Sequence, residues 1–139
     1  METNLGRIEL VKDINPNGNS SLENFIEFNY ELYFTAAELW VTNSTSSGTN
    51  LVRDINLNNI YLAEFDNRLY FGADGDENGR ELWVSDGTSE GTSLIKNIHP
   101  ATEGSSSYPH SSNPSGFTEF NDKLYFSTDY GLAAIARIV

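Results

Sequence analysis

The sequence contains no cysteine, only 8 Lys and Arg residues against 20 Asp and Glu residues, and no long apolar run. The lack of cysteine excludes disulfides, thiolate nucleophiles, and zinc or iron-sulfur sites with Cys ligands. A net charge of -12 at pH 7 repels phosphate backbones, so we expect no nucleic-acid partner. No apolar stretch approaches the roughly 20 residues of a membrane helix, and the first residues lack a signal-peptide pattern. We therefore expect no membrane insertion, and the localisation stays undetermined.

The apolar residues, 38% of the chain, are organised in an internal repeat. Residues 38–55, ELWVTNSTSSGTNLVRDI, align without a gap on residues 81–98, ELWVSDGTSEGTSLIKNI, with ten of eighteen positions identical and a period of 43 residues. The tail of this block occurs a third time as LVKDI, residues 10–14. Such a period is typical of repeat architectures rather than of one irregular domain.

A second block also recurs, as FNYELYF from Phe28, FDNRLYF from Phe65 and FNDKLYF from Phe120. Within it, Leu69 and Phe71 share one face of a strand while Tyr70 takes the other, so both faces are apolar. Together the blocks predict four short strands in each unit, with Asx-rich hairpin turns between them. Small antiparallel sheets that are covered on both faces and repeat in this way are typical of β-propeller blades.

We therefore predict an all-β fold made of four-stranded antiparallel blades of a β-propeller-like repeat. A single repeat region, residues 1–139, would hold about three units, with the terminal one split or incomplete. Residues 1–14 would be a leftover outer strand, residues 22–55 unit one, residues 60–98 unit two, and residues 115–139 a partial unit three.

The motifs LYF, ELWV, SDGT, GT and LVKDI, in that order, resemble the bacterial ELWxxDGT repeat family, which is also described as hyalin-like. The second unit, residues 69–98, matches nearly throughout, and the resemblance extends from about Leu10 to Phe126. It implies a β-propeller-like region of the kind found in large bacterial proteins that are often secreted or surface-associated. The proteins of this family usually have no assigned catalytic activity.

The units depart from one another in three places. The first lacks about six residues between Phe34 and Glu38, and the third carries an insertion at residues 99–114. After Asp129 the sequence GLAAIARIV replaces the ELWV strand; it is either an apolar third strand or an end produced by truncation. Three blades are fewer than the four to eight of closed propellers. The chain is therefore either a fragment of a longer repeat array, or a homo-oligomer in which two chains complete a six-bladed ring.

The sharpest chemical motif is the loop that contains Asp74, Asp76 and Asn78, followed by Gly79. Oxygen-bearing side chains at alternate positions before a glycine are a geometry by which short loops bind calcium. The same residues are also ordinary hairpin-turn residues, so the loop is either a calcium site or only a turn. The pattern argues against an EF-hand, because Ser85 stands at the twelfth loop position and the flanks are expected to be strands.

Trp40 and Trp83 occupy equivalent positions of the repeat, which favours packing between blades over a platform for stacking sugars. His99 and His110 lie in the long insertion without an orienting acidic partner, so we interpret them as surface residues rather than a catalytic or metal pair. We assign no catalytic residue and no cofactor-binding residue.

Three threonines directly follow a glycine in the turns between the third and fourth expected strands: Thr49, Thr88 and Thr92. We interpret them as hydroxyls that stabilise turns, because no general base or oxyanion hole accompanies them. The sequence thus favours a non-enzymatic binding or scaffold module with a protein or glycan partner. The alternatives are a calcium-stabilised adhesion or surface-layer segment and, with less support, a hydrolase.

Overall fold

The computed structural model describes residues 6–57, 62–75, 79–96, 111–128 and 134–138. These residues form eleven β-strands and no helix, so the predicted all-β fold class is confirmed. Accordingly, the described part of the chain offers no helix that could cross a membrane.

The strands form three open antiparallel sheets in which neighbours in sequence are neighbours in space. The first sheet contains β1 (Glu23–Phe28), β2 (Glu31–Ala36), β3 (Glu38–Thr42) and β4 (Asn50–Arg53). The second contains β5 (Ala63–Phe65), β6 (Arg68–Asp74), β7 (Arg80–Ser85) and β8 (Ser93–Lys96). The third contains β9 (Ser115–Phe120), β10 (Lys123–Thr128) and β11 (Ala134–Ile138), in the order β11-β10-β9.

The first hairpin of every sheet turns through two residues with positive φ. The pairs are Asn29 and Tyr30 (51° and 63°), Asp66 and Asn67 (48° and 58°), and Asn121 and Asp122 (50° and 59°). Two positive φ values are those of a type I′ turn, whose twist matches the flanking strands, and Asn and Asp tolerate them best. The two Asx turns that the sequence predicts are therefore confirmed.

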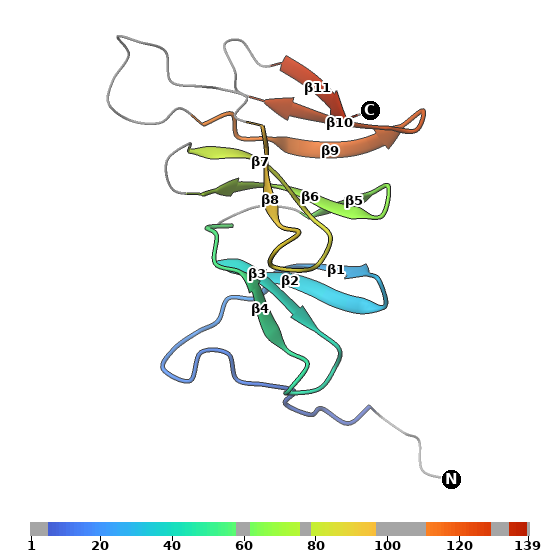
Figure 1. The fold of residues 1–139 in the computed structure, drawn as a ribbon. Coiled ribbons are helices and arrows are strands. Elements are labelled where there is room, and N and C mark those ends of the chain that lie inside the picture. The colour runs from blue at the N-terminus through green and yellow to red at the C-terminus, as the bar shows by residue number, and fades with distance from the viewer. Residues whose placement is uncertain (1–5, 58–61, 76–78, 97–110, 129–133, 139) are drawn as a thin grey trace.

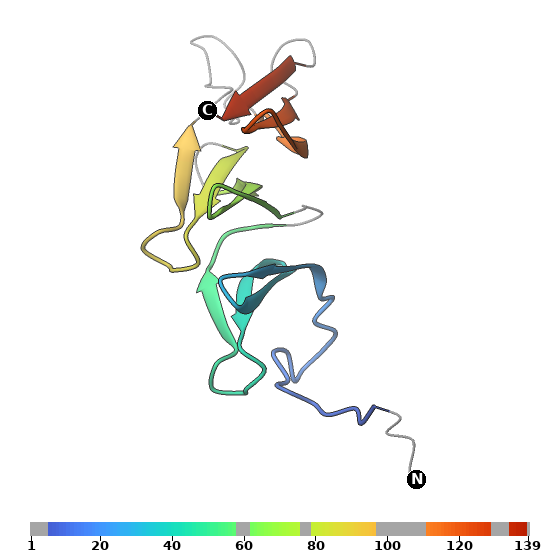
Figure 2. The ribbon, with the colours of Figure 1, turned by 90° about the vertical axis from the view of Figure 1, so that its right-hand side faces the viewer.

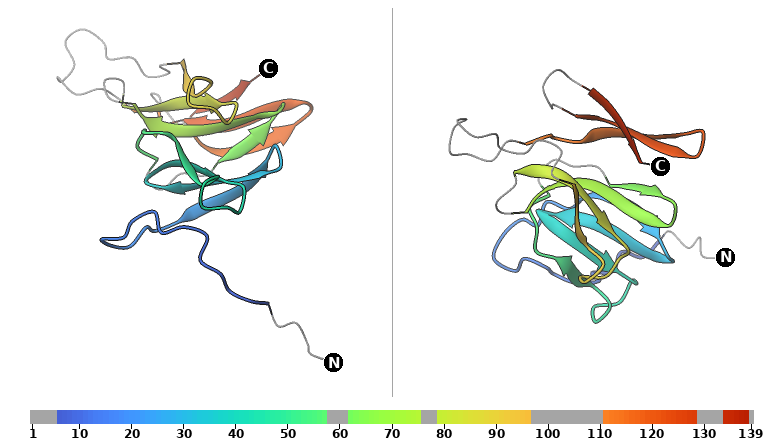
Figure 3. Two further views of the ribbon diagram at one scale, coloured as in Figure 1. Left: turned by 60° about the horizontal axis from the view of Figure 1, so that its bottom comes forward. Right: turned by 45° about the horizontal axis from the view of Figure 1, so that its top comes forward.

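The three sheets lie on top of one another along the chain (Figures 1 and 2), and each junction is filled by an apolar core. The first core joins residues of the first and second sheets: Phe28, Tyr33, Leu39, Val52, Ile55, Leu57, Leu69, Phe71, Ala73 and Trp83. The second core joins Phe65 and Tyr70 of the second sheet to Leu124 of the third. The second sheet is thus covered on both faces (Figure 3), as the apolar residues on both faces of its strands predict.

Both ends of the chain bear on the predicted unit boundaries. Residues 6–22 belong to no strand, so the expected outer strand within residues 1–14 is not formed by the part that is described. Figures 1 and 2 show the start of this segment extending away from the first sheet, and its later part looping back beside the sheet to enter β1. At the other end β11 pairs with β10 over Ala134–Ile138, so the apolar tail serves as a third strand.

Candidate functional site

The outward side of the first sheet is an apolar face without a sheet against it. We call this the first open face, and it consists of Phe25, Leu32, Phe34, Trp40 and Leu51. Cross-strand pairing of Phe34 with Trp40, and of Trp40 with Leu51, sets these side chains on one side of the sheet. Phe25 is 56% exposed and Leu51 is 44% exposed, while the ring of Phe34 stacks on Trp40 with a centroid separation of 6.5 Å.

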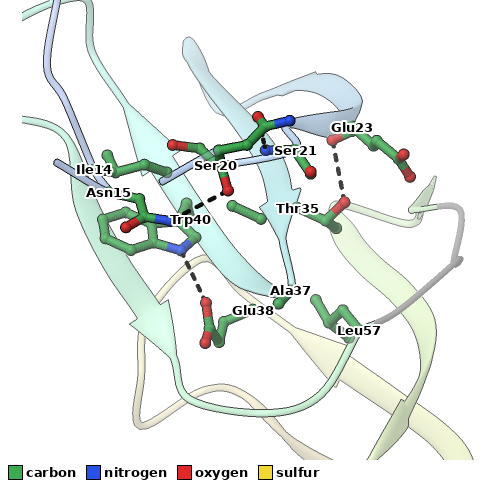
Figure 4. Close-up of a pocket in the computed structure, with 12 residues that line it drawn as sticks. Ile14, Asn15, Ser20, Ser21, Glu23, Thr35, Ala37, Glu38, Trp40 and Leu57 are labelled. Atoms are coloured by element: carbon green, nitrogen blue, oxygen red, sulfur yellow. Dashed lines mark hydrogen bonds between the residues drawn. The ribbon is translucent and has the colours of Figure 1, made fainter. Parts of the chain in front are cut away.

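A pocket of about 660 Å³ lies beside Trp40 (Figure 4). One side comes from the turn between β2 and β3, and the other from the chain that leads into β1. Its lining residues are Ile14, Asn15, Asn19, Ser20, Ser21, Glu23, Thr35, Ala36, Ala37, Glu38, Trp40 and Leu57. The pocket therefore combines one indole with amide, hydroxyl and carboxylate groups.

Hydrogen bonds hold the pocket residues in place (Figure 4). The indole Nε1 of Trp40 donates to Oε2 of Glu38 at 3.4 Å, and this bond orients both side chains beside the pocket. On the opposite wall, Nδ2 of Asn15 donates to the carbonyl of Asn19 at 3.2 Å and closes a local loop. The half-buried indole and the exposed amides thus present an apolar plane rimmed by polar groups.

The pocket lies where the connection between the second and third strands is about six residues shorter in the first unit than in the second unit. There, Gly75 lies so close to Trp83 that an added Cβ would collide with its ring. Trp83 is 8% exposed and belongs to the first core, so the predicted packing role is confirmed for this tryptophan. The first unit turns directly from Ala36 to Glu38, and Trp40 is left only half-buried. The shortened hairpin was visible in the sequence, but the pocket that it opens was not predicted.

The glutamate of the ELW motif also differs between the units. Glu81 is fully buried and accepts hydrogen bonds from the backbone N of Ser112 at 3.2 Å and from its Oγ at 2.7 Å. In the first unit the equivalent residue is Glu38. Leu57 takes the place of Ser112 there, because its backbone N–H donates to the carbonyl of Ala37 as that of Ser112 donates to the carbonyl of Arg80. Because leucine has no hydroxyl, Glu38 faces the pocket instead.

Only part of the predicted calcium loop lies among the described residues. Asp74 is exposed, and its backbone N and O pair with Asn56 in an isolated bridge. Asp76 and Asn78 lie outside the described residues, so calcium binding stays a prediction. Within the described ranges no three His, Cys, Asp or Glu residues gather as a metal site would need.

The turn chemistry predicted for the threonines is confirmed. In the second unit, Oγ1 of Thr88 donates to Oδ1 of Asp86 at 2.7 Å, and Oγ1 of Thr92 donates to the carbonyl of Thr88 at 2.6 Å. The bonds from Thr88 lower the pKa of the Asp86 carboxyl, because they favour its charged form. In the first unit, Oγ1 of Thr49 likewise donates to the carbonyl of Thr45 at 2.7 Å.

A second titratable group is built into the junction between the first two sheets. Burial, with the nearby charge of Glu31, raises the pKa of Tyr33 to about 12. Its hydroxyl donates to Glu31 Oε2 at 3.4 Å, and Gly87 of the second unit lies against it. This tyrosine packs the core rather than poising an acid or base. His99 and His110 lie outside the described residues.

Comparisons with known proteins give no further guide to the site. No model of a known protein family matches the chain, and neither the curated proteins nor the solved structures contain a match. The resemblance to the ELWxxDGT repeat family therefore stays a prediction.

Proposed function

We propose that the protein is a non-enzymatic binding module of the β-propeller type, in which the three sheets are successive blades. The regular stack supports this proposal, because each junction repeats the same contacts. Phe28 pairs with Tyr33 at 5.6 Å between ring centroids, and Phe65 pairs with Tyr70 at 6.2 Å. Both pairs lie in the core toward the following sheet.

The observation that carries the binding function is the pocket beside Trp40. Sugars combine an apolar face with hydroxyl groups, so they fit an indole plane surrounded by amides, hydroxyls and carboxylates. A net charge of -12 disfavours anionic ligands at long range. We therefore propose a neutral glycan as the ligand, with stacking on Trp40 and hydrogen bonds to Glu38 and Asn15.

Titration calorimetry with a panel of neutral oligosaccharides tests the proposal. Trp40→Ala should weaken binding by about tenfold, because loss of an aromatic contact costs on the order of 1 kcal/mol. Trp40→Phe keeps an aromatic plane but not the Nε1 donor, and should lose less. Tyr30→Ala is the matched control, since Tyr30 is fully exposed on a hairpin away from the pocket. No binding by the unmodified protein, or equal losses in Trp40→Ala and Tyr30→Ala, would reject the glycan site.

An enzymatic role is the competing outcome of the same experiment. Two glutamates, Glu23 and Glu38, are among the residues around the pocket, and glycoside hydrolysis generally uses a carboxylate pair. The panel should therefore be assayed for release of reducing ends after prolonged incubation. A binding module leaves every oligosaccharide intact, whereas turnover that disappears in Glu38→Gln would replace the proposed function by a hydrolase.

A further inference from the structure

The outward side of the third sheet repeats a contact that is buried at both junctions. Phe120 and Tyr125 form the same ring pair, 6.3 Å between centroids, as Phe28 with Tyr33 in the first sheet. Phe28 is 4% exposed under the second sheet, whereas Phe120 is 63% exposed. We call the outward side with Phe120 and Tyr125 the second open face. At both junctions the equivalent ring pair lies in the core toward the following sheet.

The first open face is the complementary surface. Its Leu32, which is 38% exposed, corresponds in the repeat to Leu69, which is fully buried against the first sheet. Phe34, the counterpart of Phe71, is 4% exposed and lies against Phe25 and Trp40. The pair of Phe25 with Phe34 likewise recurs as Phe117 with Phe126 in the third sheet, at 5.7 and 5.4 Å. The molecule therefore shows how the two kinds of face fit together, because its own junctions join one of each.

Among the described residues the third sheet has three strands, whereas the other two sheets have four. Its edge strand β11 pairs with β10 alone among the described strands. In the first sheet the corresponding strand, β3, is paired with β4, which contains the first residues of the LVRDI sequence. In the second sheet, β7 is paired with β8, which has the sequence SLIK. An exposed strand edge is a template for adding another strand.

A segment with the sequence of that strand lies outside any sheet, where Lys12 Nζ donates to the carbonyl of Thr49 at 2.9 Å. Residues 10–14, LVKDI, match residues 51–55, LVRDI, at four of five positions, yet they belong to no strand. Leu10 is 82% exposed and Val11 is 43% exposed, whereas Val52, the counterpart of Val11, is 5% exposed in the first core. The described residues thus include both an unpaired segment with the sequence of an outer strand and a sheet of three strands.

The two cannot meet within one molecule. Residues 10–14 lie at the end of the stack beyond the first sheet, and β11 lies at the opposite end (Figures 1 and 2). We propose that two copies of the chain associate head to tail, with residues 10–14 of each copy added to β11 of the other as a fourth strand. The second open face of each copy then covers the first open face of the other.

The repeat also predicts the register of the exchanged strand. In the first sheet Phe34 is opposite Trp40, and Trp40 is opposite Leu51. In the third sheet Phe126, the counterpart of Phe34, is opposite Ala136. Leu10, the counterpart of Leu51, therefore lies opposite Ala136 of the second copy.

Two copies with three sheets each give six blades, within the range of about four to eight that closes a propeller. A head-to-tail contact that closes in this way leaves no open face, whereas one that does not close would continue as a filament. Trp40 belongs to both the first open face and the pocket, so the contact between copies covers one side of its indole, while most of the other pocket residues come from the β2–β3 turn and residues 14–21 at the rim of the sheet.

The mass in solution gives the first test. Sedimentation equilibrium of the full chain should give twice the 15.5 kDa of one copy. Val11→Asp and Phe120→Asp should give the monomer, because each places a carboxylate in the buried contact. Asn17→Asp and Tyr30→Asp make matched changes at exposed positions outside the contact and should stay dimeric. A folded monomer, or an assembly larger than two copies, would overturn the proposal.

A disulfide cross-link tests the register directly, since the natural chain has no cysteine. Leu10→Cys and Ala136→Cys proteins are refolded together and oxidised. Paired strand positions bring two Cα atoms within the distance that a disulfide spans, so a covalent dimer is expected. Leu10→Cys refolded with Tyr30→Cys should give only the background level. Equal cross-linking in the two mixtures would reject the exchanged strand, and neither result bears on whether the pocket binds a glycan.

Discussion

The first and second sheets are built from nearly the same sequence and have different surroundings. Both have four strands in the order of the chain, and both have an irregularity at the leucine and tryptophan of the ELW motif, where the third strand meets the fourth. Leu69 of the second sheet is 0% exposed, whereas Leu32 at the same position of the first sheet is 38% exposed. Equal strands therefore do not imply equal burial, because a face is covered only if another sheet lies against it.

The comparison extends to polar groups at the junctions. Glu81 is buried with two hydrogen bonds from Ser112, while Glu38 lines an open pocket. The two indole groups differ as well. Within the described part of the chain Trp83 Nε1 has no hydrogen-bond partner, whereas Trp40 Nε1 donates to Glu38. The connecting segment thus supplies a serine hydroxyl to the glutamate of the second unit and a leucine, which has no hydroxyl, at the same place of the first unit.

The largest expected difference is between two leucines at equivalent positions. Leu69→Ala should lower the free energy of unfolding by about 2 to 5 kcal/mol, because it leaves a cavity in the first core. Leu32→Ala should cost the monomer less than about 1 kcal/mol, since little buried area is lost. Urea denaturation measures both. If two copies associate, the cost of Leu32→Ala should rise with protein concentration, and similar costs at high dilution would contradict the comparison.

The buried carboxylate of the second sheet provides the next test. Ser112→Ala removes the hydroxyl that donates to Glu81, and should cost about 1 to 3 kcal/mol because a buried acceptor loses a bond. Ser115→Ala is the matched control, as its hydroxyl contacts Ser127 at an exposed position and should change stability by less than about 0.5 kcal/mol. Thermal unfolding of both variants measures the difference. An unchanged stability of Ser112→Ala would show that the hydroxyl does not support the buried side chain of Glu81.

Substitutions at Asp86 should change the free energy of unfolding by a smaller amount, and this change should depend on pH. Asp86→Ala should cost on the order of 1 kcal/mol through loss of the bonds from Thr88, while Asp86→Asn should be nearly neutral, because Asn43 fills the same role in the first unit. The pKa of Asp86 is lowered in the folded state, so its contribution is present above the unfolded pKa and is lost as the pH falls through the folded value. Asp86→Asn should lack this loss below about pH 4. An unchanged acid profile would contradict the assignment.

The smallest effect at neutral pH is expected for Tyr33→Phe. The pKa of Tyr33 is raised to about 12, so the unfolded chain loses this proton first and stability falls as the pH rises from about 10 to 12. Tyr33→Phe should remove part of that fall and change little at pH 7. Tyr30→Phe, on an exposed turn, is the control and should keep the alkaline fall. Denaturation midpoints across this range measure it, and parallel curves for wild type and Tyr33→Phe would reject burial of the hydroxyl.

Much of the fold could be predicted from the sequence because its signals are local. Alternation in RLYFG sets Leu69 and Phe71 against Tyr70, and the structure puts the first two in one core and the third in the other. Type I′ turns followed from the Asx pairs for the same reason. The pocket beside Trp40 could not be predicted, because Asn15 and Ser20 approach Glu38 only through the path of an irregular segment.

The sequence by itself determined the repeat, the strands and which side chains share a face, since each follows from the period of the strand and the chemistry of its turns. Only the tertiary structure decided which faces are covered. Trp83 and Trp40 stand in the same motif, but one is packed against a neighbouring sheet and the other lines an open pocket. Burial depends on what lies on the far side of a face, and residues distant in sequence supply that.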